Sequence, residues 1–267
     1  MKKEEKKYVY PSIIKIESLS EKLIIINRQL EEKNKLLEES ELARKNMFSN
    51  ITHDLRAPVA VIRGAVERLR QEGLGDKEQH KLISIIDSRA ATLEHLIYDL
   101  HFSALLEQPV FELSPTRMEI APFLEEYFIS MESAGHLDGR KSGVSIPAGI
   151  STHAMIDLRY FLRVLDNLLE NAIKHTKQGD LIEIGCLEDD GNAVIFFTDS
   201  GSGIPAGDLP YVFERTFTGM AARTPGKSGS GLGLSISRTI VEKHGGRIEC
   251  SSISGKGTTF TIFLPLV

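Results

Sequence analysis

A histidine with an acidic neighbour stands inside a long segment of helical apolar periodicity. His53 and Asp54 belong to the run Phe48–Pro58, and His53 lies two residues from both Ile51 and Leu55. On a helix this spacing turns the imidazole away from the apolar stripe. Imidazole is a good nucleophile near neutral pH, and an adjacent carboxylate can orient the ring and accept a proton. The pattern suggests a nucleophilic histidine, although a surface histidine without a role fits these residues taken alone.

A second polar set recurs at positions i, i+4, i+7 and i+8 of a predicted helix. Leucine, alanine and isoleucine fill the opposite side of that helix. Amide oxygens suit Mg²⁺, which prefers hard oxygen ligands, and a lysine one turn further on can neutralise phosphate charge. Asparagine is a poor helix former, so two of them favour a functional face over a merely solvated one. The residues of this face are Asn167, Asn171, Lys174 and His175.

Two glycine-bearing turns add a possible nucleotide site. In the first, Asp199 ends a predicted strand and is followed by Gly201 and Gly203. An acid there can accept the exocyclic amine of adenine, and glycines let the backbone approach the ring. The second turn leads directly into a predicted helix, where free backbone N–H groups can cradle phosphate. Its residues are Gly229, Gly231, Gly233 and Leu234. Each turn alone also fits an ordinary tight turn.

The segment between the two turns has the composition of a lid. Two phenylalanines, Phe213 and Phe217, precede the small and polar stretch 220–228. Enzymes that transfer phosphoryl groups close such segments over the nucleotide. An ordinary surface loop with two aromatic anchors is the alternative interpretation.

The elements that must position these residues begin with a long helix over residues 12–69. Leu23, Leu30 and Leu37 recur every seventh residue between glutamates and lysines, which is typical of a coiled-coil seam. A polar turn with two glycines separates this helix from a second apolar stripe that ends near Ala104. A single hairpin cannot bury both stripes. We therefore expect a homodimer in which two hairpins form a four-helix bundle.

A different pattern begins after the proline-bearing stretch 109–116. Helices are predicted over 121–134, 158–174 and 234–244, and strands over 153–156, 181–187, 193–199, 247–252 and 258–264. Strand hairpins mixed with helices indicate an α+β fold with helices on one face of a sheet. We expect four parts: a helical signalling segment (1–45), a helical hairpin (46–108), a linker (109–116) and an α/β sandwich domain (117–267).

Composition excludes several classes of protein. The net charge of −5 gives no basic footprint, so we expect no direct contact with nucleic acid. Cys186 and Cys250 do not form a disulfide framework, which favours a reducing, cytoplasmic setting. The longest early apolar run, Leu23–Ile26, is far shorter than the roughly 18 residues of a spanning helix. We expect any membrane or sensor region to lie outside this chain.

In their order along the chain, the five motifs closely resemble the H, N, G1, F and G2 boxes of sensor histidine kinases, over about residues 45–266. The resemblance implies a dimeric helical domain followed by a Bergerat-type ATP-binding sandwich, as in the gyrase, Hsp90 and MutL superfamily. It implies ATP-dependent phosphorylation of His53 and transfer to an aspartate on a response-regulator receiver domain. By position, the catalytic pair is His53 and Asp54, and the Mg²⁺ ligand is Asn171. The other nucleotide-binding positions are Asn167, Lys174, His175, Asp199, Gly201, Gly203, Gly229, Gly231, Gly233, Leu234 and Thr258.

Two positions separate this chain from some relatives in the resemblance. ATP-hydrolysing members carry a glutamate where Asn167 stands, and an amide cannot activate water, which fits transfer to histidine. Ala57 replaces a hydrogen-bonding residue that helps many relatives dephosphorylate their partner, so we expect weak phosphatase activity. The alternatives are a nucleotide-binding pseudokinase scaffold, an ATPase of the wider superfamily, and a structural coiled-coil adaptor.

Overall fold

The computed structural model describes residues 5–71, 73–106, 108, 110–137, 139–215, 217 and 231–267. Within the first helix, the side chains of residues 5–18, 20, 40, 43, 46 and 47 are not described. The chain forms two compact units, Met1–His53 and Asp54–Val267.

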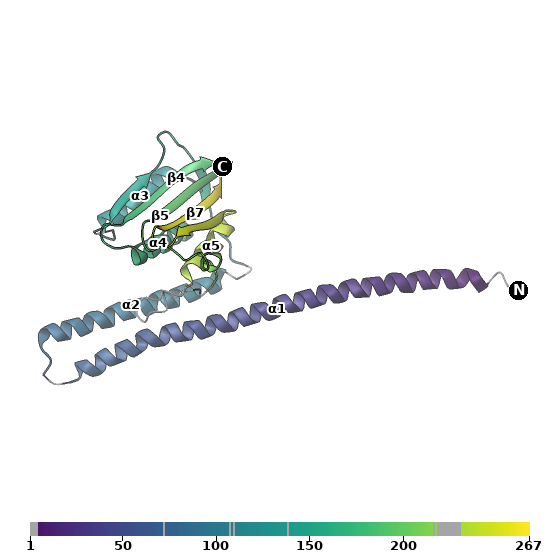
Figure 1. The fold of residues 1–267 in the computed structure, drawn as a ribbon, viewed down its shortest axis with the longest axis horizontal. Coiled ribbons are helices and arrows are strands. Elements are labelled where there is room, and N and C mark those ends of the chain that lie inside the picture. The colour runs from purple at the N-terminus through teal and green to yellow at the C-terminus, as the bar shows by residue number, and fades with distance from the viewer. Residues whose placement is uncertain are drawn as a thin grey trace. The chain divides into compact units, whose positions relative to one another are not determined.

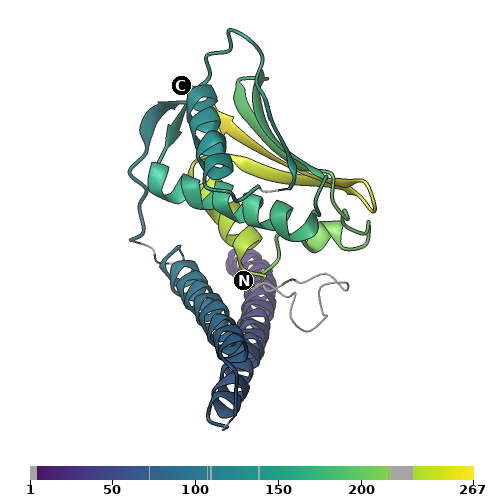
Figure 2. The same cartoon turned by 90° about the vertical axis from the view of Figure 1, so that its left-hand side faces the viewer.

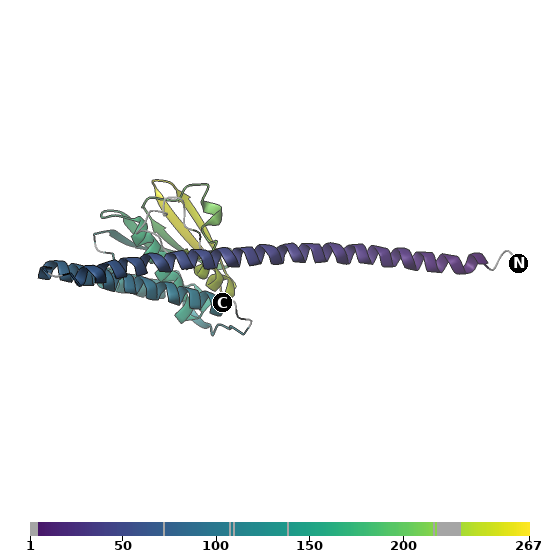
Figure 3. The ribbon, with the colours of Figure 1, turned by 90° about the horizontal axis from the view of Figure 1, so that it is seen from below.

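The first helix, α1, is continuous from Glu5 to Leu69 and contains 65 residues (Figure 3). It begins seven residues before the predicted start at residue 12. In the second unit, a turn containing Gly73 at φ 86° leads to α2, Asp76–Leu106. Arg68 donates across the turn to Glu78 from both Nε (3.3 Å) and Nη2 (3.2 Å). The predicted helical hairpin is therefore present. Among the described helices, none is both long and apolar enough to cross a membrane.

The rest of the second unit is a five-stranded mixed sheet with helices on one face (Figure 1; Figure 2). The strand order is β2-β4-β5-β7-β6, with β2 parallel to β4 and the other pairs antiparallel. The strands are β2 (Lys141–Ser145), β4 (Leu181–Asp189), β5 (Asn192–Asp199), β6 (Arg247–Ile253) and β7 (Gly257–Pro265). The helices are α3 (Ile120–Ser133), α4 (Leu158–His175) and α5 (Gly233–Lys243). The predicted α+β fold is confirmed.

Period-two alternation places one face of each strand against the helices. Ile184, Phe197 and Phe260 are adjacent across three strands, and each is 5% exposed or less. Phe161 and Leu165 of α4 are fully buried on the helical side of this core. Asp190 (φ 45°) and Gly191 (φ 74°) make the two-residue turn between β4 and β5, a conformation that Asp and Gly tolerate.

Two short strands and one single-turn helix were not predicted. β1 (Thr116–Glu119) pairs with β3 (His153–Ile156) as a small antiparallel sheet, and β2 extends the large sheet at its edge. A 3-10 helix spans Leu209–Tyr211. The sequences TRME and KSGVS are short and largely polar, so neither shows the apolar alternation that marks a strand.

Asp157 stands at the predicted N-cap of α4 but does not cap it with its side chain. Its Oδ2 accepts the N–H of Ser114 (2.9 Å), and its own N–H donates to Nε2 of His244 (3.0 Å). The Nδ1 of His244 lies 2.7 Å from the carbonyl of Ile240. His244 therefore joins the end of α5 to the start of α4 as a neutral ring, and burial lowers its pKa.

Candidate functional site

Asp199 is the acidic group of the site and lies at the end of β5, opposite Thr258 of β7. It is 7% exposed, and its Oδ1 accepts the N–H of Gly201 at 2.8 Å. Burial raises the pKa of this carboxyl, while backbone N–H groups of Gly201 and Thr258 act in the opposite direction. The net effect is a raised pKa, because desolvation disfavours the charged form.

The glycines after Asp199 allow close packing of the protein's own backbone. A Cβ on Gly201 would collide with the carbonyl oxygen of His175 at the end of α4. Gly203 has φ 64°, and a Cβ there would collide with the carbonyl of Ile253. The N–H of Ser202 also donates to the carbonyl of His175 (3.1 Å). The turn that follows Asp199 is thus fixed to the C-terminal end of α4.

Sequence reasoning missed one residue that contacts this turn, Ser252 of β6. Its Oγ donates to the carbonyl of Gly257 (2.7 Å), accepts the N–H of Ile204 (2.8 Å) and lies 3.0 Å from Oγ1 of Thr258. Ser252 therefore ties the Asp199 turn to the start of β7. Pairing the two final strands by their short connection would have placed Ser252 directly opposite Thr258.

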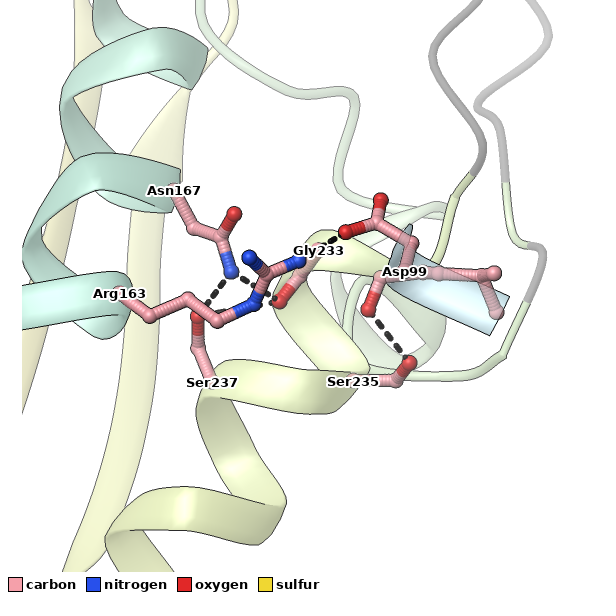
Figure 4. Close-up of polar contacts among 7 residues, drawn as sticks. Asp99, Arg163, Asn167, Gly233, Ser235 and Ser237 are labelled. Atoms are coloured by element: carbon pink, nitrogen blue, oxygen red, sulfur yellow. Dashed lines mark hydrogen bonds and ion pairs between the residues drawn. The ribbon is translucent and has the colours of Figure 1, made fainter. Parts of the chain in front are cut away.

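The two asparagines of α4 make different contacts. Nδ2 of Asn167 donates to the carbonyl of Gly233 (3.0 Å) and to Oγ of Ser237 (3.2 Å), both on α5 (Figure 4). Nδ2 of Asn171 donates to the carbonyl of Asn167 (3.0 Å), so its Oδ1 is the atom suited to ligate a cation. Ser237 is a further contact that the sequence did not single out, although it lies one turn after Gly233.

The last turn of α4 carries Lys174 and His175 on the solvent side. Partial desolvation lowers the pKa of Lys174, although its side chain still reaches solvent. His175 contributes its backbone carbonyl to the Asp199 turn. All four polar residues predicted on this helix are therefore on α4, which begins at the Asp157 cap position and ends beside the first glycine turn.

The second glycine turn leads into α5, as predicted. Gly231 has φ 64°, Leu232 is fully buried, and Ser235 Oγ caps the turn by donating to the Leu232 carbonyl (2.8 Å; Figure 4). Gly233 is the first residue of α5 and Leu234 follows it, half-buried. Gly229, together with residues 218–230 that include most of the predicted lid, lies outside the described residues.

His53 belongs to the first unit and is exposed on α1, as its spacing predicted. Ile51, on the apolar stripe, is buried at 6% exposure. Asp54 follows directly and is half-buried. Thr52 keeps its hydroxyl on the helix by donating to the carbonyl of Phe48 (2.8 Å). The imidazole of His53 therefore faces solvent, whereas the side chain of Ile51 lies on a buried side of the same helix.

The residues of the second unit fit a magnesium-bound nucleoside triphosphate. A buried carboxylate acceptor, Asp199, suits an amino-substituted base. The start of α5 presents backbone N–H groups and the positive end of a helix dipole, which suit phosphate. The amide oxygen of Asn171 is a hard ligand of the kind that Mg²⁺ shares with phosphates and water. Two contacts of α4 join these groups. Asn167 contacts Gly233 at the start of α5, and the carbonyl of His175 accepts the N–H of Ser202 in the turn after Asp199.

Two family models match the chain. Residues 43–108 match the His Kinase A (phospho-acceptor) domain, and residues 156–267 match the histidine kinase-, DNA gyrase B- and HSP90-like ATPase domain. The sensor protein SrrB of Staphylococcus aureus strain MRSA252 is 32% identical over 224 residues. That alignment covers 83% of this chain and 38% of SrrB, so the chain spans about two fifths of this relative.

Solved structures share the fold. The histidine kinase AdeS of Acinetobacter baumannii has a TM-score of 0.61 at 22% identity, covering 80% of this chain and 98% of that one. The histidine kinase ThkA, solved in complex with the response regulator protein TrrA, has a TM-score of 0.69 at 22% identity, covering 86% and 66%. The two domain models in their order, with the SrrB alignment spanning both, show that the chain belongs to the sensor histidine kinases of two-component systems.

Proposed function

We propose that the chain uses ATP to phosphorylate His53 and passes the phosphoryl group to an aspartate of a response regulator. The observation that carries the proposal is that one chain contains both an exposed imidazole, on α1, and a sandwich with a buried carboxylate, Asp199. Membership of the family supports the same activity.

In the sandwich, Asp199 would accept the exocyclic amine of adenine, and Thr258 lies beside it, joined to Ser252. The N-terminal turn of α5, with Gly231 and Gly233, would hold the phosphates through backbone N–H groups. Gly229 would extend this contact at the hinge of the lid. The side-chain amide of Asn167 donates to the carbonyl of Gly233, so Asn167 would keep the phosphate-binding turn against α4.

Asn171 is the residue that would hold Mg²⁺, with Lys174 and His175 near the phosphates at the end of the same helix. When bound, the cation would neutralise charge on the phosphates, which phosphoryl transfer needs more than covalent chemistry from the protein. Asn167 has no basic atom that could activate water, so the site favours a histidine acceptor over hydrolysis.

His53 would attack the γ-phosphorus of ATP through a ring nitrogen, since the neutral imidazole is nucleophilic near pH 7. The N–P bond would form as the bond from the γ-phosphorus to the bridging oxygen breaks and ADP leaves. Asp54 would orient the ring and take its proton. A phosphorylated imidazole on an exposed helix position is accessible to a partner protein, which fits transfer to a receiver domain. The structural neighbour ThkA was solved with such a regulator.

The apolar side chains that α1 exposes support a homodimer. Leu23, Leu30 and Leu37 are 55%, 52% and 62% exposed, although their seven-residue spacing is that of a coiled-coil seam. A second copy of α1 would cover this seam. The phospho-acceptor domain match supports the same assembly.

The test is labelling with γ-³²P-ATP and Mg²⁺ of the wild-type chain, His53→Gln, Asn171→Ala and, as a control, His80→Gln. His80 is another exposed histidine, on α2, with its Nδ1 near the carbonyl of Asp76. We expect acid-labile, base-stable label in the wild type and the His80 variant and none in the other two. Wild-type ATP binding without any label would favour a pseudokinase scaffold, and rapid phosphate release without label would favour an ATPase.

A further inference from the structure

The C-terminal end of α4 is closed differently from the ends of α3 and α5. Shortly after their last residues, α3 and α5 each reach a glycine in the left-handed conformation, Gly135 (φ 79°) and Gly245 (φ 77°). Such a glycine turns the chain back, so that the following N–H groups satisfy the last carbonyls of the helix. α4 is followed instead by Thr176, whose backbone is extended (φ −108°, ψ 161°). The chain therefore leaves α4 without turning back over the carbonyls of its last turn.

A guanidinium group binds the end of α4 in place of a glycine turn. Nε of Arg140 donates to Oγ1 of Thr176 (2.7 Å), and Nη2 donates to the carbonyls of Ile173 (2.9 Å) and Thr176 (3.3 Å). Thr176 is buried, and its hydroxyl donates in turn to the carbonyl of Ala172 (2.6 Å). The last carbonyls carry the negative end of the helix dipole, so a cation is favourable there. The planar fork of an arginine can reach several acceptors at once, which a single ammonium group cannot.

The backbone on both sides of Arg140 is fixed to the loop that follows α4. The carbonyl of Gly139 accepts the N–H of Gly179 (2.6 Å), and the N–H of Lys141 donates to the carbonyl of Asp180 (2.7 Å). Lys141 is also the first residue of β2, which pairs with β4 at the edge of the large sheet. The edge of the sheet therefore sets the position from which Arg140 reaches α4.

The helix end that Arg140 binds is also the part of α4 that fixes the turn after Asp199. The carbonyl of His175 accepts the N–H of Ser202 (3.1 Å), and a Cβ on Gly201 would lie 2.3 Å from that carbonyl oxygen. The N–H of Gly201 donates in turn to Oδ1 of Asp199 (2.8 Å). A continuous series of contacts thus joins Arg140 to the Asp199 carboxylate through the last turn of α4.

We propose that Arg140 is a positioning residue for recognition of the nucleotide base. By holding the last turn of α4, Arg140 sets the place where the Asp199 carboxylate accepts the exocyclic amine of adenine. This inference rests on the proposed function, and it assigns selectivity for an amino-substituted base to a residue that does not touch the nucleotide. Loss of Arg140 should therefore reduce discrimination between bases, because the phosphate contacts lie at the start of α5.

The test is calorimetric titration with Mg-ATP and with the Mg complex of purine riboside triphosphate, which lacks the exocyclic amine. In the wild type, the second Kd should be roughly 10- to 150-fold higher than the first, because the difference reports a hydrogen bond to a charged group. In Arg140→Ala this ratio should fall about tenfold, toward one, because a displaced carboxylate loses the distance and angle of that bond. Arg140→Lys should lower the ratio in the same direction, although it keeps the charge. Lys141→Ala changes an exposed neighbouring cation and should leave the ratio unchanged.

Two further measurements separate positioning from a general loss of stability. In an Asp199→Asn background, Arg140→Ala should raise the Kd for Mg-ATP no further, because both changes act through the same carboxylate. Amide hydrogen exchange at Gly201 and Ser202, measured without nucleotide, should be severalfold faster in Arg140→Ala and unchanged in Lys141→Ala.

An equal rise of both Kd values in Arg140→Ala, with the ratio unchanged, would overturn the positioning role, because partial unfolding has that effect. Additive effects of Arg140→Ala and Asp199→Asn would overturn it as well, as would unchanged amide exchange. If Arg140→Ala does not fold, Arg140→Lys decides the question by the same ratio. A wild-type chain that binds neither nucleotide would instead overturn the proposed function, and amide exchange would still show whether Arg140 holds the turn.

Discussion

Replacing Asp199 by asparagine should weaken ATP binding while making the nucleotide-free protein more stable. The substitution keeps the oxygen that accepts the Gly201 N–H at 2.8 Å, so the turn itself can persist. It removes the negative charge that would accept the adenine amine. A hydrogen bond to a charged group contributes about 1.5–3 kcal/mol, which predicts a roughly 10- to 150-fold higher Kd for Mg-ATP.

The stability effect has the opposite sign because burial raises the pKa of Asp199. A carboxyl whose folded pKa is raised contributes stability at low pH, and this contribution is lost as the pH rises through the folded pKa. At neutral pH the ionised Asp199 therefore destabilises the nucleotide-free fold. Asparagine removes that penalty, so the melting temperature should rise.

Calorimetric titration with Mg-ATP and thermal unfolding without nucleotide, both near pH 7, measure the two effects. Asp208→Asn is a matched control, since Asp208 also lies in the segment after β5 but is only half-buried. An unchanged Kd in Asp199→Asn would refute the adenine contact. A lower melting temperature would refute the argument from desolvation.

Three further outcomes follow from the structure. Burial lowers the pKa of His244, so the stability contributed by its neutral form should be full above the ordinary histidine pKa of about 6.5 and should decline as the pH falls below that value. Denaturant unfolding at a series of pH values should show this decline, and His244→Gln should flatten it. Gly185→Ala should destabilise the sheet by about 1–3 kcal/mol, because the Phe196 ring already fills the space that a Cβ would take. Gly207→Ala is the control, since a Cβ there would meet open space. Equal unfolding curves for the two variants would contradict this prediction. With ADP present, the chain should hardly accelerate decay of a phosphorylated regulator, because Ala57 cannot orient a water, and acceleration matching the forward transfer rate would disprove it.

The parts of the site that lie within one helix or one turn could be predicted from the sequence. Asn167 and Asn171 share a face because helical spacing dictates it, and Asp199 ends a strand that its apolar alternation makes recognisable. His53 is exposed for the same reason that Ile51 is buried. The hairpin between β4 and β5 could also be predicted, because Asp190 and Gly191 tolerate the left-handed backbone conformation of its turn.

Contacts between distant segments had no local signal. Asp99 and Arg163 are 64 residues apart, and neither belongs to a recognisable motif. Asp157 was correctly placed at the start of α4, but its carboxylate binds the N–H of Ser114 because the chain entering from the linker offers that donor. The edge strand β2 was missed since its exposed, polar sequence gains its structure only from pairing with β4.

The central claim is that His53 accepts phosphate from ATP, and locating the phosphate tests it most directly. After incubation with Mg-ATP, the chain is digested with trypsin under alkaline conditions and the phosphorylated peptide is sequenced by mass spectrometry. The account predicts phosphate on residues 46–56, assigned to His53, and its loss after mild acid treatment. Acid-stable phosphate on Ser49 or Thr52 of the same peptide, or phosphate on another histidine, would contradict it.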